Sequence, residues 1–288
     1  MMTYLLTGFL LLVPQPAAES AAAVKAAEEK NTEIDALRAE GLKHLDRGEL
    51  AEAIRVLGEA RAKGAEDTVT RIALGRAYLA REMFQQALIE FSEVLKKDPN
   101  HVMANLGRAD SLIGLGDARK AIGPAKLIAE IEPRSARAWL TLGRAYMHDQ
   151  VADYPRAQAA FKHALELVPD SRDAAVNLAR ALSFAKKVEQ AIEVLQNLHR
   201  KHPGDMPIII SLAESYYAIR KLDQAEKLID EALAADPHDS DALRVRDQIR
   251  SRQAYNFWVP VIAVIAFPLL FVLIRWMKKG RVPKVAGD

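Results

Sequence analysis

Alanines recur along this chain at an almost constant spacing. Successive members are 34 residues apart, except the third and fourth, which are 36 apart; the set is Ala53, Ala87, Ala121, Ala157, Ala191 and Ala225. Five of the six segments close with a proline, at Pro99, Pro133, Pro169, Pro203 and Pro237. A period of about 34 residues, with apolar positions at helical spacing on both sides of a short turn, is typical of stacked helix-turn-helix units. The spacing therefore predicts an all-α repeat fold.

A second periodic set of small residues precedes these alanines. Its members are Gly41, Gly75, Ala109, Gly143, Ala179 and Ala213. We expect the two helices of each unit to cross there, because a larger side chain would force their axes apart. One hairpin is too small to bury its own apolar face, so neighbouring units must stack into a superhelix with one concave surface.

Two of the six segments also have characteristic residues at many further equivalent positions. In the fourth these are Trp139, Leu142, Gly143, Tyr146, Ala157, Phe161, Ala164 and Pro169, and in the second Leu74, Gly75, Tyr78, Ala87, Phe91 and Pro99. On these residues the chain resembles the tetratricopeptide repeat family over residues 34–239. The resemblance implies a right-handed superhelical solenoid of six repeats, at 34–67, 68–101, 102–135, 136–171, 172–205 and 206–239.

The amino-terminal end departs from the repeat pattern. Leu5 to Val13 is an apolar run, too short to span a bilayer, which needs about 20 apolar residues. An Ala/Ser-rich stretch follows, as in a secretory signal cleaved after Ser20 or Ala23. We expect a signal peptide at 1–23 and a helical or disordered spacer at 24–33. Since Met1 to Tyr4 contains no Lys or Arg, an uncleaved anchor or an apolar end without signal function is the alternative.

The carboxyl-terminal end predicts a membrane span. Phe257 to Ile274 contains no charged residue and, at about 1.5 Å per residue, is about 27 Å long as a helix. Tyr255, Trp258 and Trp276 frame it like an aromatic belt. We expect a capping helix at 240–254, a transmembrane helix at 255–277 and a basic cytoplasmic tail at 278–288.

Orientation depends on the charges around this span and on the signal. The tail is basic, with Arg275, Lys278, Lys279, Arg281 and Lys284. The upstream flank is basic too, so charge bias alone decides little and the signal carries more weight. The repeats are then expected outside the cytoplasm, in a bacterial periplasm. If the amino-terminal run is not a signal, the protein is instead a cytosol-facing, tail-anchored receptor.

Composition argues against several classes of function. The chain holds 40 basic and 38 acidic residues, a net charge of +2, which does not favour nucleic-acid binding. It has no cysteine, which excludes disulfides and thiolate chemistry. His199 and His202 have metal-ligand spacing but lack a third ligand nearby in sequence, and favourable interaction with a helix C-terminus explains them better. We therefore expect no enzyme activity, cofactor or metal.

The family resemblance places a binding groove on the first helix of each repeat. Carried onto this chain, the groove residues are Arg76, Leu79, Asp110, Ile113, Arg144, Met147, Arg180, Phe184, Glu214 and Tyr217. Such a surface suits an extended peptide or helix with acidic and apolar side chains. The alternative is that each arginine pairs with a neighbouring acid, for example Arg144 with Asp110.

Three functions compete at this point. The first is a membrane-anchored scaffold of the cell envelope that gathers proteins for assembly, secretion or export. The second is a cytosol-facing receptor or adaptor of an organelle membrane. The third is an enzyme or cofactor carrier, for which the sequence offers no convincing site. Self-association through Pro268 or the groove is left open.

Overall fold

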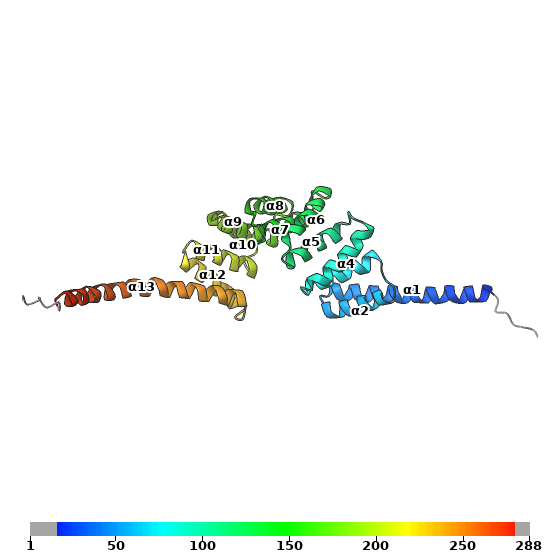
Figure 1. The fold of residues 1–288 in the computed structure, drawn as a ribbon, viewed down its shortest axis with the longest axis horizontal. Coiled ribbons are helices and arrows are strands. Elements are labelled where there is room, and N and C mark those ends of the chain that lie inside the picture. Colours follow the sequence, from blue (N-terminus) through cyan, green and yellow to red (C-terminus); the bar gives the residue numbers. More distant parts are fainter. Residues whose placement is uncertain (1–15, 280–288) are drawn as a thin grey trace, which may run out of the picture. The chain divides into compact units, whose positions relative to one another are not determined.

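The computed structural model describes residues 16–279, with side chains for 24–275, and this part contains thirteen α-helices and no strand (Figure 1). The predicted all-α repeat fold is therefore confirmed. The apolar run Leu5–Val13 and the tail beyond Lys279 lie outside the described residues.

The chain forms two compact units, Met1–Ala152 and Asp153–Asp288. The first contains α1 (Pro16–Asp46), α2 (Leu50–Ala62), α3 (Thr68–Ala80), α4 (Phe84–Lys97), α5 (Val102–Gly114), α6 (Ala118–Ile131) and α7 (Ala136–Met147). The second contains α8 (Tyr154–Leu167), α9 (Arg172–Phe184), α10 (Val188–Lys201), α11 (Met206–Ala218), α12 (Leu222–Ala235) and α13 (Ser240–Lys279).

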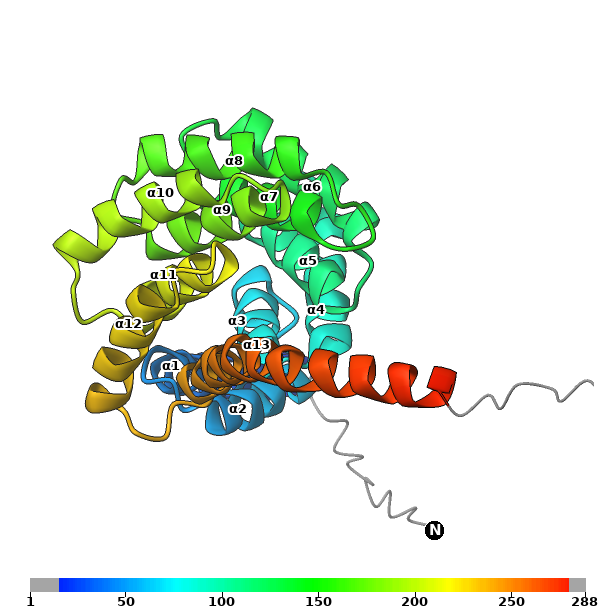
Figure 2. The same cartoon turned by 90° about the vertical axis from the view of Figure 1, so that its left-hand side faces the viewer.

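Within each unit the helices pack as antiparallel neighbours along the chain. The first helices of successive hairpins also pack on one another: α1 on α3, α3 on α5 and α5 on α7 in one unit, and α9 on α11 and α11 on α13 in the other. The second helices of successive hairpins form no comparable contacts within the described residues. In Figure 2, α9 and α11 lie on the inner side of the second unit and α10 and α12 on the outer side. The first helices therefore form the more closely spaced row.

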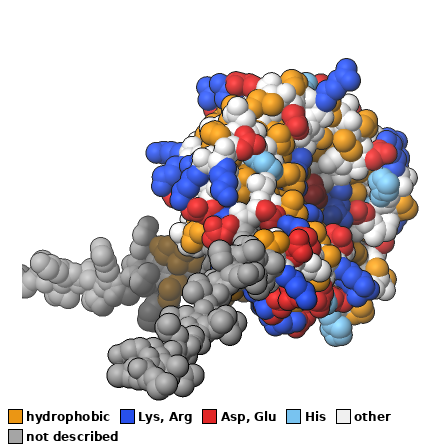
Figure 3. All heavy atoms as spheres, turned by 90° about the vertical axis from the view of Figure 1, so that its right-hand side faces the viewer, with side chains coloured by type: hydrophobic (Ala, Val, Ile, Leu, Met, Phe, Trp, Pro, Cys, Tyr) orange, Lys and Arg blue, Asp and Glu red, His pale blue; other side chains and the backbone are white. Residues whose placement is uncertain are grey.

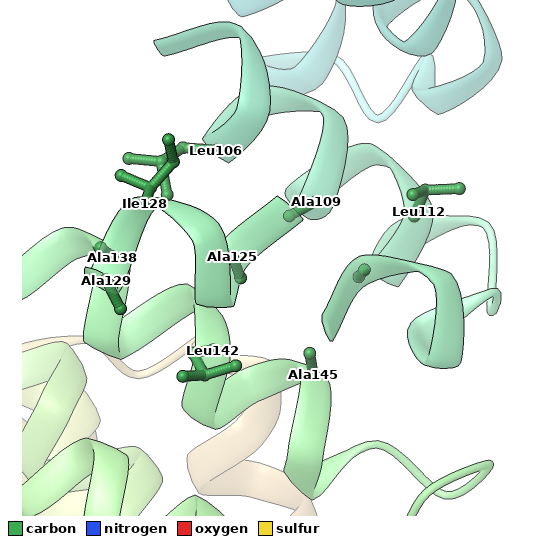
Figure 4. Packing of buried hydrophobic residues seen from close by; sticks show 10 residues of the cluster. Leu106, Ala109, Leu112, Ala125, Ile128, Ala129, Ala138, Leu142 and Ala145 are labelled. Atoms are coloured by element: carbon green, nitrogen blue, oxygen red, sulfur yellow. The ribbon is translucent and has the colours of Figure 1, made fainter. Parts of the chain in front are cut away.

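The core of the third repeat shows how each hairpin is closed by its neighbours. Leu106 on α5 lies beside Ile128 on α6, and Leu142 on α7 belongs to the same cluster (Figure 4). Leu106 and Ile128 are almost completely buried. Burial of apolar surface between three helices stabilises the stack, since no single hairpin encloses such a core.

The glycines on the first helices stand where a larger residue would collide. A Cβ atom on Gly41 would meet Leu57 Cγ at 2.5 Å, and one on Gly75 would meet Phe91 Cζ at 2.7 Å. Both partners belong to the second helix of the same hairpin, as we expected from the spacing. A helix crossing at short distance requires a residue without a side chain at these two positions.

Helix α13 continues without interruption from the last repeat into the apolar segment. Its first part contributes Ala242, Val245 and Ile249, which are buried against α11 and α12. Its later part is long and apolar enough to cross a membrane, with a mean hydropathy of 2.8 over its most apolar window and none of that window buried. The predicted capping and apolar segments thus lie on one helix.

Candidate binding groove

The first unit has a hollow of about 440 Å³ along its row of first helices. Arg76 and Leu79 reach it from α3, Asp110 from α5 and Arg144 from α7. The structure therefore brings together four of the six groove residues predicted in this unit. Small residues beside them on the same helices, such as Ala77 and Ala109, are buried in the core, so these four side chains lie on the other side of their helices.

Asp110 lies close to two arginines in this hollow. Its carboxylate accepts a hydrogen bond of 2.9 Å from Arg144 Nη1 and lies 3.6 Å from Arg137 Nη2. The side chain of Asp110 is only 13% exposed. Arg144 is thus held by a neighbouring acid, as the alternative interpretation proposed. Arg76 is exposed and forms no ion pair or hydrogen bond with any side chain in the described part of the chain.

The other two predicted residues of this unit do not line the hollow. Ile113 is half-buried and packs against the core cluster of the third repeat. Met147 is half-buried at the end of α7.

The second unit has its own hollow, of about 420 Å³, between α9 and α11. Arg180, Phe184 and Glu214 line it, and Tyr217 does not. Arg244 on α13 donates a hydrogen bond of 2.8 Å to Glu214. Arg180 is exposed and has no ionic or hydrogen-bonding partner among the described residues.

An aromatic pair borders this second hollow. The ring of Phe184 stacks on that of Tyr154 with centroids 5.3 Å apart, and Phe184 nevertheless remains 54% exposed. An exposed aromatic ring beside an unpaired guanidinium offers a ligand both apolar surface and a charged hydrogen-bond donor.

Several lining residues were not predicted from the sequence. They are Leu50, Ala80, Phe84 and Arg137 in the first hollow, and Ala179, Ser211, Ser215 and Ala218 in the second. Part of this set could have been found from helical periodicity, because residues three, four or seven apart lie on one face of a helix. Arg137 lies two turns before Arg144, and Ser211, Ser215 and Ala218 share a face with Glu214. Leu50 and Phe84 begin the second helices, so their contribution depends on the hairpin geometry.

The described residues contain no group of three His, Cys, Asp or Glu side chains placed to hold a metal ion. His199 and His202 in particular do not form such a group with a third ligand. Acidic and basic side chains are intermixed over the face shown in Figure 3.

Helical hairpins stacked with a hollowed row of first helices are the architecture of a protein-interaction scaffold. Two family models match the repeats: the tetratricopeptide repeat at residues 44–106 and the cytochrome c-type biogenesis protein H TPR domain at residues 126–243. The chain is a tetratricopeptide repeat protein.

The protein O-mannosyl-transferase Tmtc3 of Drosophila melanogaster is 26% identical over 187 residues, which cover 60% of this chain and 20% of that protein. This chain therefore corresponds to one fifth of that relative's length.

Among solved structures, a tetratricopeptide repeat protein of Parabacteroides merdae has a TM-score of 0.64 at 20% identity, covering 77% of this chain and 88% of that one. MamA of Desulfovibrio magneticus, from residue 41 to its end, has a TM-score of 0.52 at 25% identity, covering 59% and 96%. Pseudomonas aeruginosa PilF has a TM-score of 0.59 at 15% identity, covering 76% and 99%.

Proposed function

We propose that this protein is a non-catalytic scaffold, anchored in a membrane by α13, that binds partner proteins along its first helices. The partner segment is an extended peptide or helix with acidic and apolar side chains. The observation that carries this proposal is the pair of exposed arginines, Arg76 and Arg180, which have no partner among the described residues and each line a hollow with apolar neighbours.

The two arginines offer more to a ligand than Arg144 does. An unpaired guanidinium can form two parallel hydrogen bonds with a carboxylate, and such charge-assisted contacts are about twice as strong as neutral ones. Arg144 already donates to Asp110, so a ligand must compete with that contact. Leu79 and Phe184 add apolar surface beside the free arginines.

The membrane anchor is supported by the length and exposure of the apolar part of α13. Leu269, Leu270 and Phe271 are each more than half exposed. A run of such residues has no protein partner within the described part of the chain and favours a lipid environment. We place the repeats on the extracytoplasmic side, in a cell-envelope assembly or export complex. The alternative is a cytosol-facing, tail-anchored receptor.

Site-directed cross-linking tests the groove, because the chain has no cysteine of its own. Photoreactive probes attached at Leu79→Cys or Ser183→Cys should cross-link to a partner in intact membranes. The matched control is Ile89→Cys, on the second helix α4, where the side chain is 51% exposed. Equal cross-linking from all three positions would contradict the groove.

Charge reversal provides the second test. The double variant Arg76→Glu/Arg180→Glu should weaken binding of the cross-linked partner at least about tenfold, because a hydrogen bond to a charged group contributes about 1.5–3 kcal/mol. Its control is Arg134→Glu/Lys162→Glu, which changes two exposed cations outside both hollows. Unchanged affinity of the groove variant would rule out the assigned arginines.

The family match over residues 126–243 favours a more specific candidate, a scaffold in cytochrome c-type biogenesis. Deletion of the gene should then lower the amount of haem-stained c-type cytochrome, and the cross-linked partner should belong to that process. Normal c-type cytochrome levels in the deletion strain would remove this candidate while leaving the general scaffold intact.

A further inference from the structure

Several exposed cations of the second unit, unpaired within the described residues, lie at the end from which the apolar segment leaves. The turn between α9 and α10 contains Lys186 and Lys187, and the turn between α11 and α12 contains Arg220 and Lys221. All four side chains are exposed, and none has an ionic partner in the described residues. Arg250 and Arg252 follow on α13, just before the apolar segment.

These six residues lie at one edge of the unit, for a topological reason. Helices α9, α11 and the first part of α13 are separated by helices that run back, so all three run in the same direction and pack in succession. Their C-terminal ends share an edge, and α13 continues past that edge. Figure 1 shows α12 beside the first part of α13. We call Lys186, Lys187, Arg220, Lys221, Arg250 and Arg252 the basic edge.

A hydrogen bond between α12 and α13 shows how far along α13 this edge lies. Gln253 donates a hydrogen bond of 2.8 Å to Glu226 in the first turns of α12. Gln253 lies four residues before Phe257, about 6 Å along the helix. The turn holding Arg220 and Lys221 precedes Glu226 and lies further toward the apolar segment. The basic edge is therefore at the depth of lipid headgroups when residues 257–274 span the bilayer.

The opposite edge has another character. Its turns contain Asp170, Asp205, Asp236 and Asp239, and two of the cations there are paired with them. Lys201 donates a hydrogen bond of 2.6 Å to Asp170, and Arg172 lies 3.7 Å from Asp205. In the first unit, the corresponding turns between first and second helices pair a cation with an acid or contain Gly, as in Arg47-Gly48-Glu49, Arg81-Glu82 and Leu115-Gly116-Asp117. Among the turns that join first to second helices in the described part of the chain, two adjacent cations occur only in these two turns of the second unit. The acids close to the basic edge, Glu189, Asp223, Glu226 and Asp247, number four against its six cations.

The backbone places Lys186 and Arg220 at the same point of their turns. Both have positive φ angles, 60° and 63°, as do Gly48, Glu82 and Gly116 at the equivalent position of the first unit's hairpins. The left-handed residue is thus a shared feature of these turns, and it puts the side chains of Lys186 and Arg220 at equivalent positions of two successive hairpins.

We propose that the basic edge docks on anionic lipid headgroups and holds the second unit against the membrane surface. This inference rests on the proposed membrane anchor. Clusters of Lys and Arg next to a span are attracted to anionic lipids, and the attraction falls off within a Debye length. Docking would fix the orientation of the second hollow relative to the bilayer, which a flexible linker could not do.

Energy transfer in reconstituted vesicles tests the docking. The full chain, with a donor dye at the exposed position Gln190→Cys near the edge, is inserted into vesicles of phosphatidylcholine alone or of equal parts phosphatidylcholine and phosphatidylglycerol. Acceptor dyes are placed on the headgroups. Transfer should be higher in the anionic vesicles and should fall to the zwitterionic value at about 1 M salt, where the Debye length is about 3 Å.

Two variants that each lose four positive charges show whether docking depends on the basic edge or only on the net charge of the protein. Lys186→Asn/Lys187→Gln/Arg220→Asn/Lys221→Gln removes four edge cations, with asparagine at the positive-φ positions because it tolerates them. Lys162→Gln/Arg172→Gln/Arg200→Gln/Lys201→Gln removes four exposed cations elsewhere on the unit. The edge variant should lose the anionic increase and the control should keep it, with equal unfolding temperatures.

Each alternative outcome has a definite meaning. Equal transfer in both vesicle types, or the same response of both variants, overturns the docking while the anchor stands. Removal of the protein from both vesicle types by an alkaline carbonate wash contradicts the membrane anchor itself, and with it the docking.

Discussion

Phe91 illustrates how a single side chain ties neighbouring repeats together. Its ring, on α4, lies against Gly75 on α3 and Gly107 on α5, and it is 1% exposed. Glycine at both contacts lets the ring fill the space between two successive first helices. The repeats are therefore coupled through one aromatic residue that has no room for a larger neighbour.

Gly75→Ala should lower the free energy of unfolding by about 1–2 kcal/mol. The added Cβ would lie 2.7 Å from two ring atoms of Phe91, and this overpacking exceeds the gain in helix propensity. Gly58→Ala on α2 is the control, since its Cβ would meet nothing within 4 Å, and it should raise stability by about 0.5–1 kcal/mol. Denaturant unfolding of both variants in detergent checks this, and a neutral Gly75→Ala would refute the tight crossing.

Glu90 holds three helices through a buried ionic cluster. Its side chain on α4 is 2% exposed and pairs with Arg61 on α2 and, at 3.0 Å, with Arg71 on α3. Removing one member of a buried cluster leaves the other charges without compensation.

Glu90→Gln should therefore lower the free energy of unfolding by about 1–3 kcal/mol, and Glu90→Ala by about 3–5 kcal/mol. Glu93→Gln on the same helix breaks only an exposed contact with Lys96 and should have little effect. Chemical denaturation of the three variants compares them directly. Similar losses of unfolding free energy for Glu90→Gln and Glu93→Gln would mean that the buried ion pairs stabilise the fold no more than the exposed pair does.

Helix α3 begins with a charged cap that also joins it to the preceding hairpin. The carboxylate of Asp67 accepts hydrogen bonds from the backbone N–H of Thr70 at 3.0 Å and from its hydroxyl at 2.8 Å. Arg38 on α1 lies 3.0 Å away. Partial burial raises the pKa of Asp67, but the hydrogen bonds from Thr70 and the charge of Arg38 outweigh it, so the pKa is lowered.

This shift predicts a specific loss of stability in acid. Because the pKa of Asp67 is lower in the folded state than its ordinary value of 3.8, its contribution is complete above that pH and is lost as the pH falls through the folded-state pKa. Asp67→Asn keeps a capping side chain but lacks the charge. The difference in Tm between wild type and Asp67→Asn should shrink between about pH 5 and pH 2. A difference that stays constant over this range would contradict the role of the carboxylate.

Across the whole molecule, the functional question is which side of the membrane carries the repeats. With residues 257–274 as the span and 1–23 as a cleaved signal, external protease should digest the repeats in intact spheroplasts. Amino-terminal sequencing should then find a mature chain that starts near Ala21 or Val24. Protected repeats together with a retained Met1 or Met2 would instead establish the cytosol-facing receptor.

The periodic alanines, glycines and prolines were sufficient to predict the repeat fold. Every hairpin needs small residues where its two helices cross and residues that form a turn at its end, so these residues recur at a fixed spacing. The apolar segment was equally visible, since length and absence of charge define it without reference to any partner. These features repeat or extend along the chain, so sequence spacing records them directly.

The properties of the groove depended instead on contacts between repeats. Arg76, Arg144 and Arg180 look equivalent in sequence, yet Arg144 is bound to Asp110, one repeat earlier, while the other two have no such partner in the described residues. Likewise, the basic edge joins turns that are 34 residues apart with a segment of α13. Side chains distant in sequence become neighbours only after the hairpins pack, and their charges are paired or left free by that packing.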